Sequence, residues 1–270
     1  MEKAFKGNGN PVIAKMGKRE DAYTGEKATF KGIIAKSFYF LALILLGLGA
    51  FIYMHSYFAN NGYDAVQITT YYSLYANEMA IFTGAIIVTL IAGLVAGFAP
   101  RTVPVTGSIY CAGMGYVVTF ISYTYAAQVQ GIVVEALFLT ILLIAIMAVL
   151  YFTGIVKVTS RFRKVLYTSL FATIIGSVVF MIVSWLFPNS SIVKSILSMQ
   201  SGPLGILFAF LGVALGCMLV LDDFETITST VNNGLSKKYE WTASYGLMIS
   251  IIYLYLRVLE LILRFSKRND

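Results

Sequence analysis

The chain has 270 residues, of which 58% are hydrophobic and only 12% are charged, and its formal net charge is +7 at pH 7. A soluble domain is nearer 25% charged, so this composition excludes a soluble globular enzyme, a disordered chain and a disulfide scaffold. It predicts a protein that crosses a membrane several times. Cys111 and Cys217 lie inside apolar stretches, and His55 is the single histidine, which leaves almost no material for a histidine-based metal or catalytic site.

Residues 1–30 are polar and rich in Gly, Asn and Lys. They have no apolar core of their own, so we expect a polar N-terminal tail. The first apolar stretch starts too far along the chain, and is too long, for a signal peptide.

Seven apolar segments then reach the length of about 20 residues that a membrane-spanning helix needs. Alternation with a period of two is absent, which favours helices over barrel strands. The predicted fold is an all-α membrane protein, a seven-transmembrane-helix bundle over residues 31–270. The expected spans are 33–54, 78–99, 105–127, 131–154, 163–187, 203–222 and 241–263.

Lysine and arginine are distributed unevenly between the two ends of these spans. Fifteen lie in the tail and in the even-numbered connections, against four on the other side, and Arg257 lies within segment seven. Basic residues accumulate on the cytoplasmic side of membrane proteins. We therefore expect a multi-pass protein of the plasma membrane with a cytoplasmic N-terminus. Seven full crossings place the C-terminus outside, and a segment that does not fully cross places it in the cytoplasm.

Two pairs of glycines four residues apart lie within predicted spans. They are Gly93 and Gly97 in segment two and Gly212 and Gly216 in segment six. Such spacing lets two helices approach closely. The partner is either a second copy of the chain or a neighbouring helix of the same bundle, and the second interpretation is the commoner one.

Three carboxylates end segment six: Asp222, Asp223 and Glu225. An ionisable group inside a bilayer costs about 2.5–3.5 kcal/mol and is a functional candidate by default. Three acids packed together could bind a hard cation through oxygen, or act as a proton-sensitive switch. The alternative is that the span ends at Asp222, the twentieth residue counted from Pro203, and that water solvates the acids.

Segment seven carries Arg257, Glu260 and Arg264 at spacings of three and four, which places them on one helix stripe. The alternative for both arginines is that they extend to the outer headgroups. Glu135, five residues into segment four, is a further candidate that could also reach the interface.

Other chemistries are not supported by the sequence. It contains no phosphate-binding Gly-x-x-x-x-Gly-Lys loop and no paired metal-binding histidines. We expect no enzyme activity and no cofactor. For the basic tail, lipid headgroups of the adjacent bilayer are the expected partner, and nucleic acid is not.

Short motifs along nearly the whole chain resemble the Bax inhibitor family, in its bacterial branch. These motifs are Asn10-Pro11-Val12, Ala99-Pro100-Arg101-x-x-Pro104-Val105, Tyr151-x-Thr153-Gly154-Ile155-x-Lys157-Val158-Thr159-x-x-Phe162-Arg163, Ser201-Gly202-Pro203-Leu204-Gly205-Ile206, Leu221-x-Asp223-Phe224-Glu225, Lys237-Lys238-Tyr239-Glu240-Trp241 and Tyr255-Leu256.

The resemblance implies a seven-helix bundle with the last helix central. It also implies a calcium or other cation leak across the bacterial inner membrane, with pH sensing through proton binding to acids in helices six and seven. The resemblance matches the family's acid in helix six to Asp223, and its usual acidic or amide neighbour to Glu225. Asp223 is therefore the candidate contact for calcium, if calcium is the transported ion. Some bacterial relatives bind and restrain a membrane protease. The alternative function is therefore a regulatory protein that binds a membrane protease or another membrane partner.

The chain departs from the family pattern at four positions. Arg257 stands where helix seven has an acid and Glu260 where this branch often has arginine, while Met114 replaces a glutamate and Glu135 a neutral residue. We expect the exchanged charges to find new partners: Arg257 with Asp223 or Glu135, and Glu260 with Arg264. A bridge to Arg257 would keep Asp223 ionised and repel a divalent cation. Helix rise, however, places Arg257 roughly 15 Å further out than Asp223 if segments six and seven end level.

Overall fold

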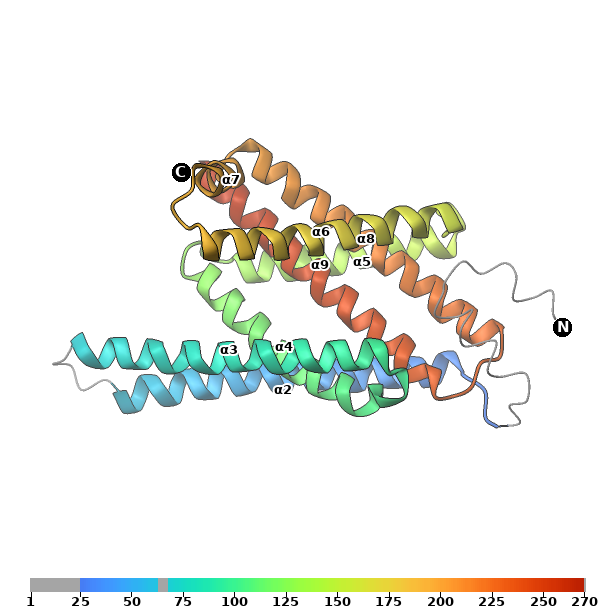
Figure 1. Cartoon of the computed structure of the whole chain (residues 1–270). Helices are drawn as coiled ribbons and strands as arrows, with labels where there is room; N and C mark the ends of the chain where they lie inside the picture. The colour runs from blue at the N-terminus through green and yellow to red at the C-terminus, as the bar shows by residue number, and fades with distance from the viewer. Residues whose placement is uncertain (1–24, 63–67, 270) are drawn as a thin grey trace. The chain divides into compact units, whose positions relative to one another are not determined.

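The computed structural model describes residues 25–62 and 68–269, and nearly all of them are helical (Figure 1). The helices are α2 (Phe30–Gly62), α3 (Ile68–Phe98), α4 (Val103–Ala126), α5 (Ile132–Phe152), α6 (Ser160–Leu186), α7 (Ser191–Ser201), α8 (Pro203–Asn232) and α9 (Tyr239–Asn269), with the short 3-10 helix η2 (Pro100–Thr102) before α4. Most of the expected polar tail lies outside the described residues.

Seven helices in the described part of the chain are long and apolar enough to cross a membrane. They are Phe30–Tyr57, Glu78–Phe98, Pro100–Ala126, Ile132–Phe152, Ser160–Leu186, Pro203–Asn232 and Tyr239–Lys267. The predicted all-α membrane fold and its number of spans are confirmed. A central position for the last helix stays a prediction.

The helix boundaries follow from local chemistry. Thr159 caps α6, because its side-chain oxygen accepts a hydrogen bond from the backbone N–H of Phe162. Pro203 occupies the first turn of α8, as predicted, where its missing N–H costs nothing. After Asn232 the chain turns at Gly234, whose φ of +62° suits glycine.

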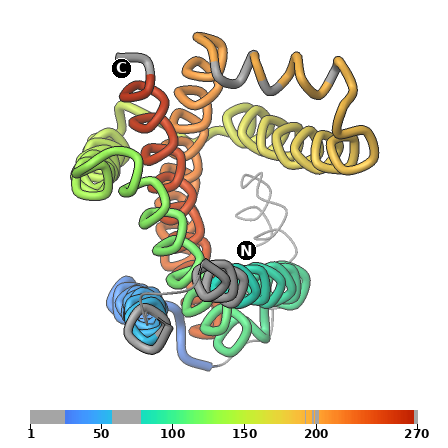
Figure 2. Tube along the Cα trace, turned by 90° about the vertical axis from the view of Figure 1, so that its left-hand side faces the viewer, coloured from blue at the N-terminus to red at the C-terminus, as the bar shows by residue number. Residues whose placement is uncertain are grey.

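The chain divides into two compact units. The first contains residues 129–229 and 250–269, and thus α5, α6, α7, most of α8 and the second part of α9. Within it, α8 and α9 lie between α5 and α6 (Figure 2). A side chain at Gly212 would meet Arg257, and one at Gly216 would meet Leu254. These glycines therefore let α8 approach α9, which confirms the interpretation of close packing within one chain for this pair.

The second unit contains residues 25–128 and 230–249, with α2, α3, α4 and the start of α9. Helices α2 and α4 cross at very short range, because a side chain at Gly47 would meet the backbone of Ala112 and one at Gly115 would meet that of Ile44. Gly93 also faces a neighbouring helix, through Tyr110.

Candidate functional site

The acids of segment six lie inside a helix, not at its end. Helix α8 continues ten residues beyond Asp222, to Asn232, and Asp222 is only 5% exposed. The expectation that the acids are solvated by water is therefore wrong for Asp222, whereas Asp223 and Glu225 are half-buried. The apolar run stops at Asp222, but the helix continues because the polar side chains that follow find partners on neighbouring helices.

Asp222 faces α6. Its Oδ1 accepts a hydrogen bond of 2.6 Å from Nε of Arg163, and its Oδ2 accepts one of 2.7 Å from the Tyr167 hydroxyl. Arg163 is 4% exposed, so this is a buried ion pair. Sequence analysis placed Arg163 among the basic residues of a connection and missed this role. The available signal was its place at the start of an apolar segment, within one of the quoted motifs.

Asp223, one residue further along the helix, faces α9. Its carboxylate hydrogen-bonds the Ser250 side chain, while its Oδ2 is buried and has no hydrogen-bond partner. The other titratable groups near it are Asp222 on its own helix and Tyr167 on α6. Among the described residues, no ion pair forms to Asp223.

Glu225 faces a third helix, α5, where its Oε2 accepts a hydrogen bond of 3.0 Å from the Tyr151 hydroxyl. The three acids thus point to three different helices and do not converge. In the described part of the chain, no three His, Cys, Asp or Glu side chains gather closely enough to hold a metal ion. Calcium as a transported ion stays a prediction.

The charges of α9 pair with one another. Nη1 of Arg257 lies 2.8 Å from Oε2 of Glu260, and Nη2 of Arg264 lies 2.7 Å from Oε1 of the same carboxylate. The predicted pairing of Glu260 with Arg264 is confirmed. The predicted pairing of Arg257 with Asp223 or Glu135 is wrong.

The register of α8 against α9 explains why Arg257 does not reach Asp223. Asp223 lies level with Ser250, and Gly212 with Arg257. Arg257 is seven residues beyond Ser250, or about 10 Å further along the helix axis. Its guanidinium packs over the ring of Tyr253, 5.1 Å from the ring centroid.

Glu135 does not join the cluster either. It is exposed in the first turn of α5, where a negative charge suits the helix N-terminus. Tyr151, which does meet the acids, lies sixteen residues later, about 24 Å along the same helix.

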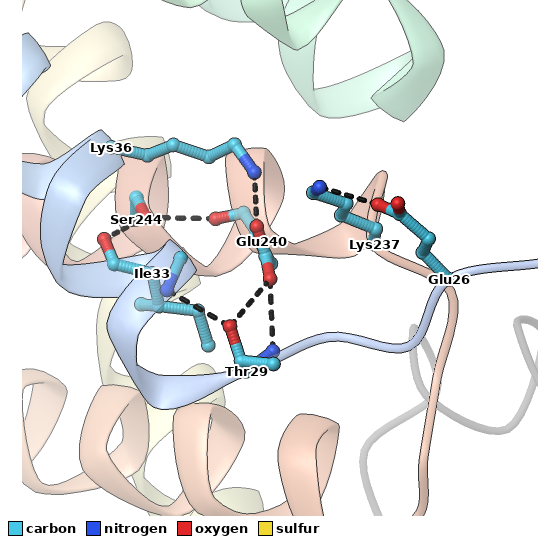
Figure 3. A network of polar contacts seen from close by, with 8 residues as sticks. Glu26, Thr29, Ile33, Lys36, Lys237, Glu240 and Ser244 are labelled. Carbon is cyan, nitrogen blue, oxygen red and sulfur yellow. Dashed lines mark hydrogen bonds and ion pairs between the residues drawn. The ribbon is translucent and has the colours of Figure 1, made fainter.

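A second polar network, which sequence analysis missed, lies in the other unit (Figure 3). Glu240 is 1% exposed and forms an ion pair with Lys36. Its Oε1 also accepts hydrogen bonds from the backbone N–H and the hydroxyl of Thr29, at 2.8 and 3.2 Å. Ser244 donates a hydrogen bond of 2.8 Å to the backbone oxygen of Ile33. The start of α9 is thereby fixed to the start of α2.

The residues just before α2 are paired with the connection between α8 and α9. Lys27 and Ser236 form an isolated antiparallel β-bridge through their backbones, and the Ala28 N–H donates a hydrogen bond of 2.7 Å to the Leu235 backbone oxygen. The end of the predicted tail is therefore part of the folded structure.

An exposed ion pair between Glu26 and Lys237 adds a contact between the residues before α2 and the connection between α8 and α9 (Figure 3). Their hydrogen bond and mutual attraction lower the pKa of Glu26 and raise the pKa of Lys237.

Long apolar helices with charged side chains buried among them define a polytopic helical membrane protein. A family model described as Bax inhibitor 1 like matches residues 10–267. The chain therefore belongs to the Bax inhibitor 1-like family, as the motifs indicated. No curated protein and no solved structure matches the chain.

Proposed function

We propose that this protein is a proton-controlled cation leak pathway, in which Asp223 binds and releases the controlling proton. The observation that carries the proposal is the difference between neighbouring acids. Asp222 has a buried arginine and a tyrosine as partners, whereas Asp223 has one hydroxyl and a buried oxygen without a partner. A carboxylate with so few partners gains most from taking up a proton or a cation.

The placement of Arg257 supports the same proposal. A cation beside Asp223 would hold it ionised and oppose a second positive charge. Arg257 is engaged by Glu260 instead, about 10 Å further along α9. We further propose a plasma-membrane location with the N-terminus in the cytoplasm, supported by the uneven distribution of lysine and arginine.

Flux measurements test the proposal. The purified protein in proteoliposomes should pass calcium or another cation at a rate that depends on pH between 5 and 8, and Asp223→Asn should abolish that pH dependence. Glu135→Gln is the matched control, because it removes an exposed carboxylate outside the cluster and should keep the parent profile. Identical pH profiles for Asp223→Asn and the parent would contradict the role of Asp223.

Absence of flux in every variant would contradict the leak pathway itself. It would favour the regulatory alternative, in which the protein binds a membrane protease or another membrane partner.

A further inference from the structure

Four basic residues lie in the connection between α5 and α6 and in the first turns of α6, and the structure separates one of them from the rest. Arg163 turns inward to Asp222 and is buried. Lys157, Arg161 and Lys164 are exposed, and no acid of the described chain forms an ion pair with any of them. Three unpaired cations thus remain on the surface within eight residues of sequence.

Exposed apolar side chains lie close to these cations in the sequence. Phe152 and Ile155 are 72% and 71% exposed, at the end of α5 and directly after it. Val165, next to Lys164 on the first turns of α6, is exposed as well. Because both helices are membrane-spanning candidates, the connection between them lies at a bilayer surface, where apolar side chains meet acyl chains and cations meet headgroups.

The local geometry suits a phosphate. Arg161 and Lys164 are three residues apart in α6 and therefore share a helix face. They lie in the first turns of a helix of 27 residues, where the N–H groups that the Thr159 cap leaves free favour negative charge. Arginine binds phosphate oxygens through two parallel hydrogen bonds, and lysine adds a point charge.

From these observations we propose that Lys157, Arg161 and Lys164 form a binding site for the phosphate of an anionic phospholipid headgroup, with Phe152, Ile155 and Val165 against its acyl chains. This inference is independent of the proposed cation leak. A free phosphate ion shares the headgroup chemistry but has no acyl chain to contact the apolar side chains.

Lipid nanodiscs test the site. The full chain is placed in phosphatidylcholine with increasing shares of phosphatidylglycerol, and bound lipid is counted by native mass spectrometry while thermal unfolding is followed. Binding of phosphatidylglycerol should saturate at a small fixed number of lipids and raise the unfolding temperature. The triple variant Lys157→Gln, Arg161→Gln, Lys164→Gln should bind it about a hundredfold more weakly, since each cation near an anionic surface changes binding roughly fivefold.

The matched control is Arg101→Gln, which removes an isolated exposed arginine directly before α4 and should leave binding unchanged. If the triple variant does not fold, Arg161→Gln alone should show a smaller loss in the same direction. Equal binding by parent and triple variant, or an equal loss in Arg101→Gln, would overturn the site. Inorganic phosphate added to phosphatidylcholine nanodiscs should not reproduce the stabilisation. If it does so fully, and the effect requires Arg161, the ligand is a soluble phosphate and the lipid assignment is overturned.

Discussion

Arg163 begins an apolar segment, yet its guanidinium lies inside the protein against Asp222. Removing one partner of a buried pair leaves an uncompensated charge, which costs about 3–5 kcal/mol. We therefore expect Arg163→Leu to destabilise the protein strongly, and the addition of Asp222→Asn to recover part of the loss. A double-mutant cycle of thermal stability in detergent measures this coupling.

The pair Arg257 and Glu260 is the matched control for that cycle. Both side chains are partly exposed and lie three residues apart on one helix, where such pairs are worth about 0.2–0.5 kcal/mol. Their coupling should therefore be small, even if Arg257→Leu alone costs packing against Gly212. A larger coupling for Arg257 and Glu260 than for Arg163 and Asp222 would contradict our assignment of the buried pair.

The sequence identified the acids but not their partners. An intramembrane charge is visible from its neighbours in the sequence, so Asp222, Asp223 and Glu225 were all candidates. Their partners Arg163, Ser250 and Tyr151 lie on three other helices, and only the packing of those helices decides which side chain faces which acid. Pairs within one turn, such as Glu260 with Arg264, could be predicted because helix geometry alone determines them.

At the scale of helices, close crossings depend on individual glycines. A methyl group at Gly115 would meet the backbone of Ile44 in α2, and a backbone cannot move away as a flexible side chain can. We expect Gly115→Ala to lower the unfolding temperature markedly, because the crossing of α2 and α4 must open.

The control for this prediction is Gly49→Ala in α2, where no described atom lies within 4 Å of the added group. Alanine favours helix over glycine by up to about 1 kcal/mol, so Gly49→Ala should be neutral or slightly stabilising. If both substitutions had the same effect on thermal unfolding, the α2–α4 crossing could not be as close as the structure places it.

Helix boundaries show how far apolar length alone predicts the fold. Segments four and five were placed within a few residues at both ends, and segment two at its C-terminal end only, because helix α3 begins ten residues before the predicted start, at Ile68. Segment six was ended ten residues too early, at Asp222, because its last three turns are polar and are held by partners such as Arg163. Hydropathy measures transfer to lipid and contains no information about those partners.

At the scale of the whole molecule, the uneven distribution of lysine and arginine predicts orientation. A single cysteine introduced at Ser160, the first residue of α6, should react with a membrane-impermeant reagent in permeabilised cells only. A cysteine at Asp64, outside the described residues and between the first two spans, should react in intact cells. Cys111 and Cys217 are replaced beforehand, since both are free thiols. The reverse labelling pattern would invert the proposed topology.

The charge triplet of α9 has a consequence for the history of this chain. Because Glu260 is satisfied by two arginines of its own helix, the acid and the base can exchange places without a compensating change elsewhere. A chain with an acid at position 257 and an arginine at position 260 would need only two substitutions in one helical turn to reach the order seen here. The order of Arg257 before Glu260 can therefore arise by neutral drift, with no change of activity.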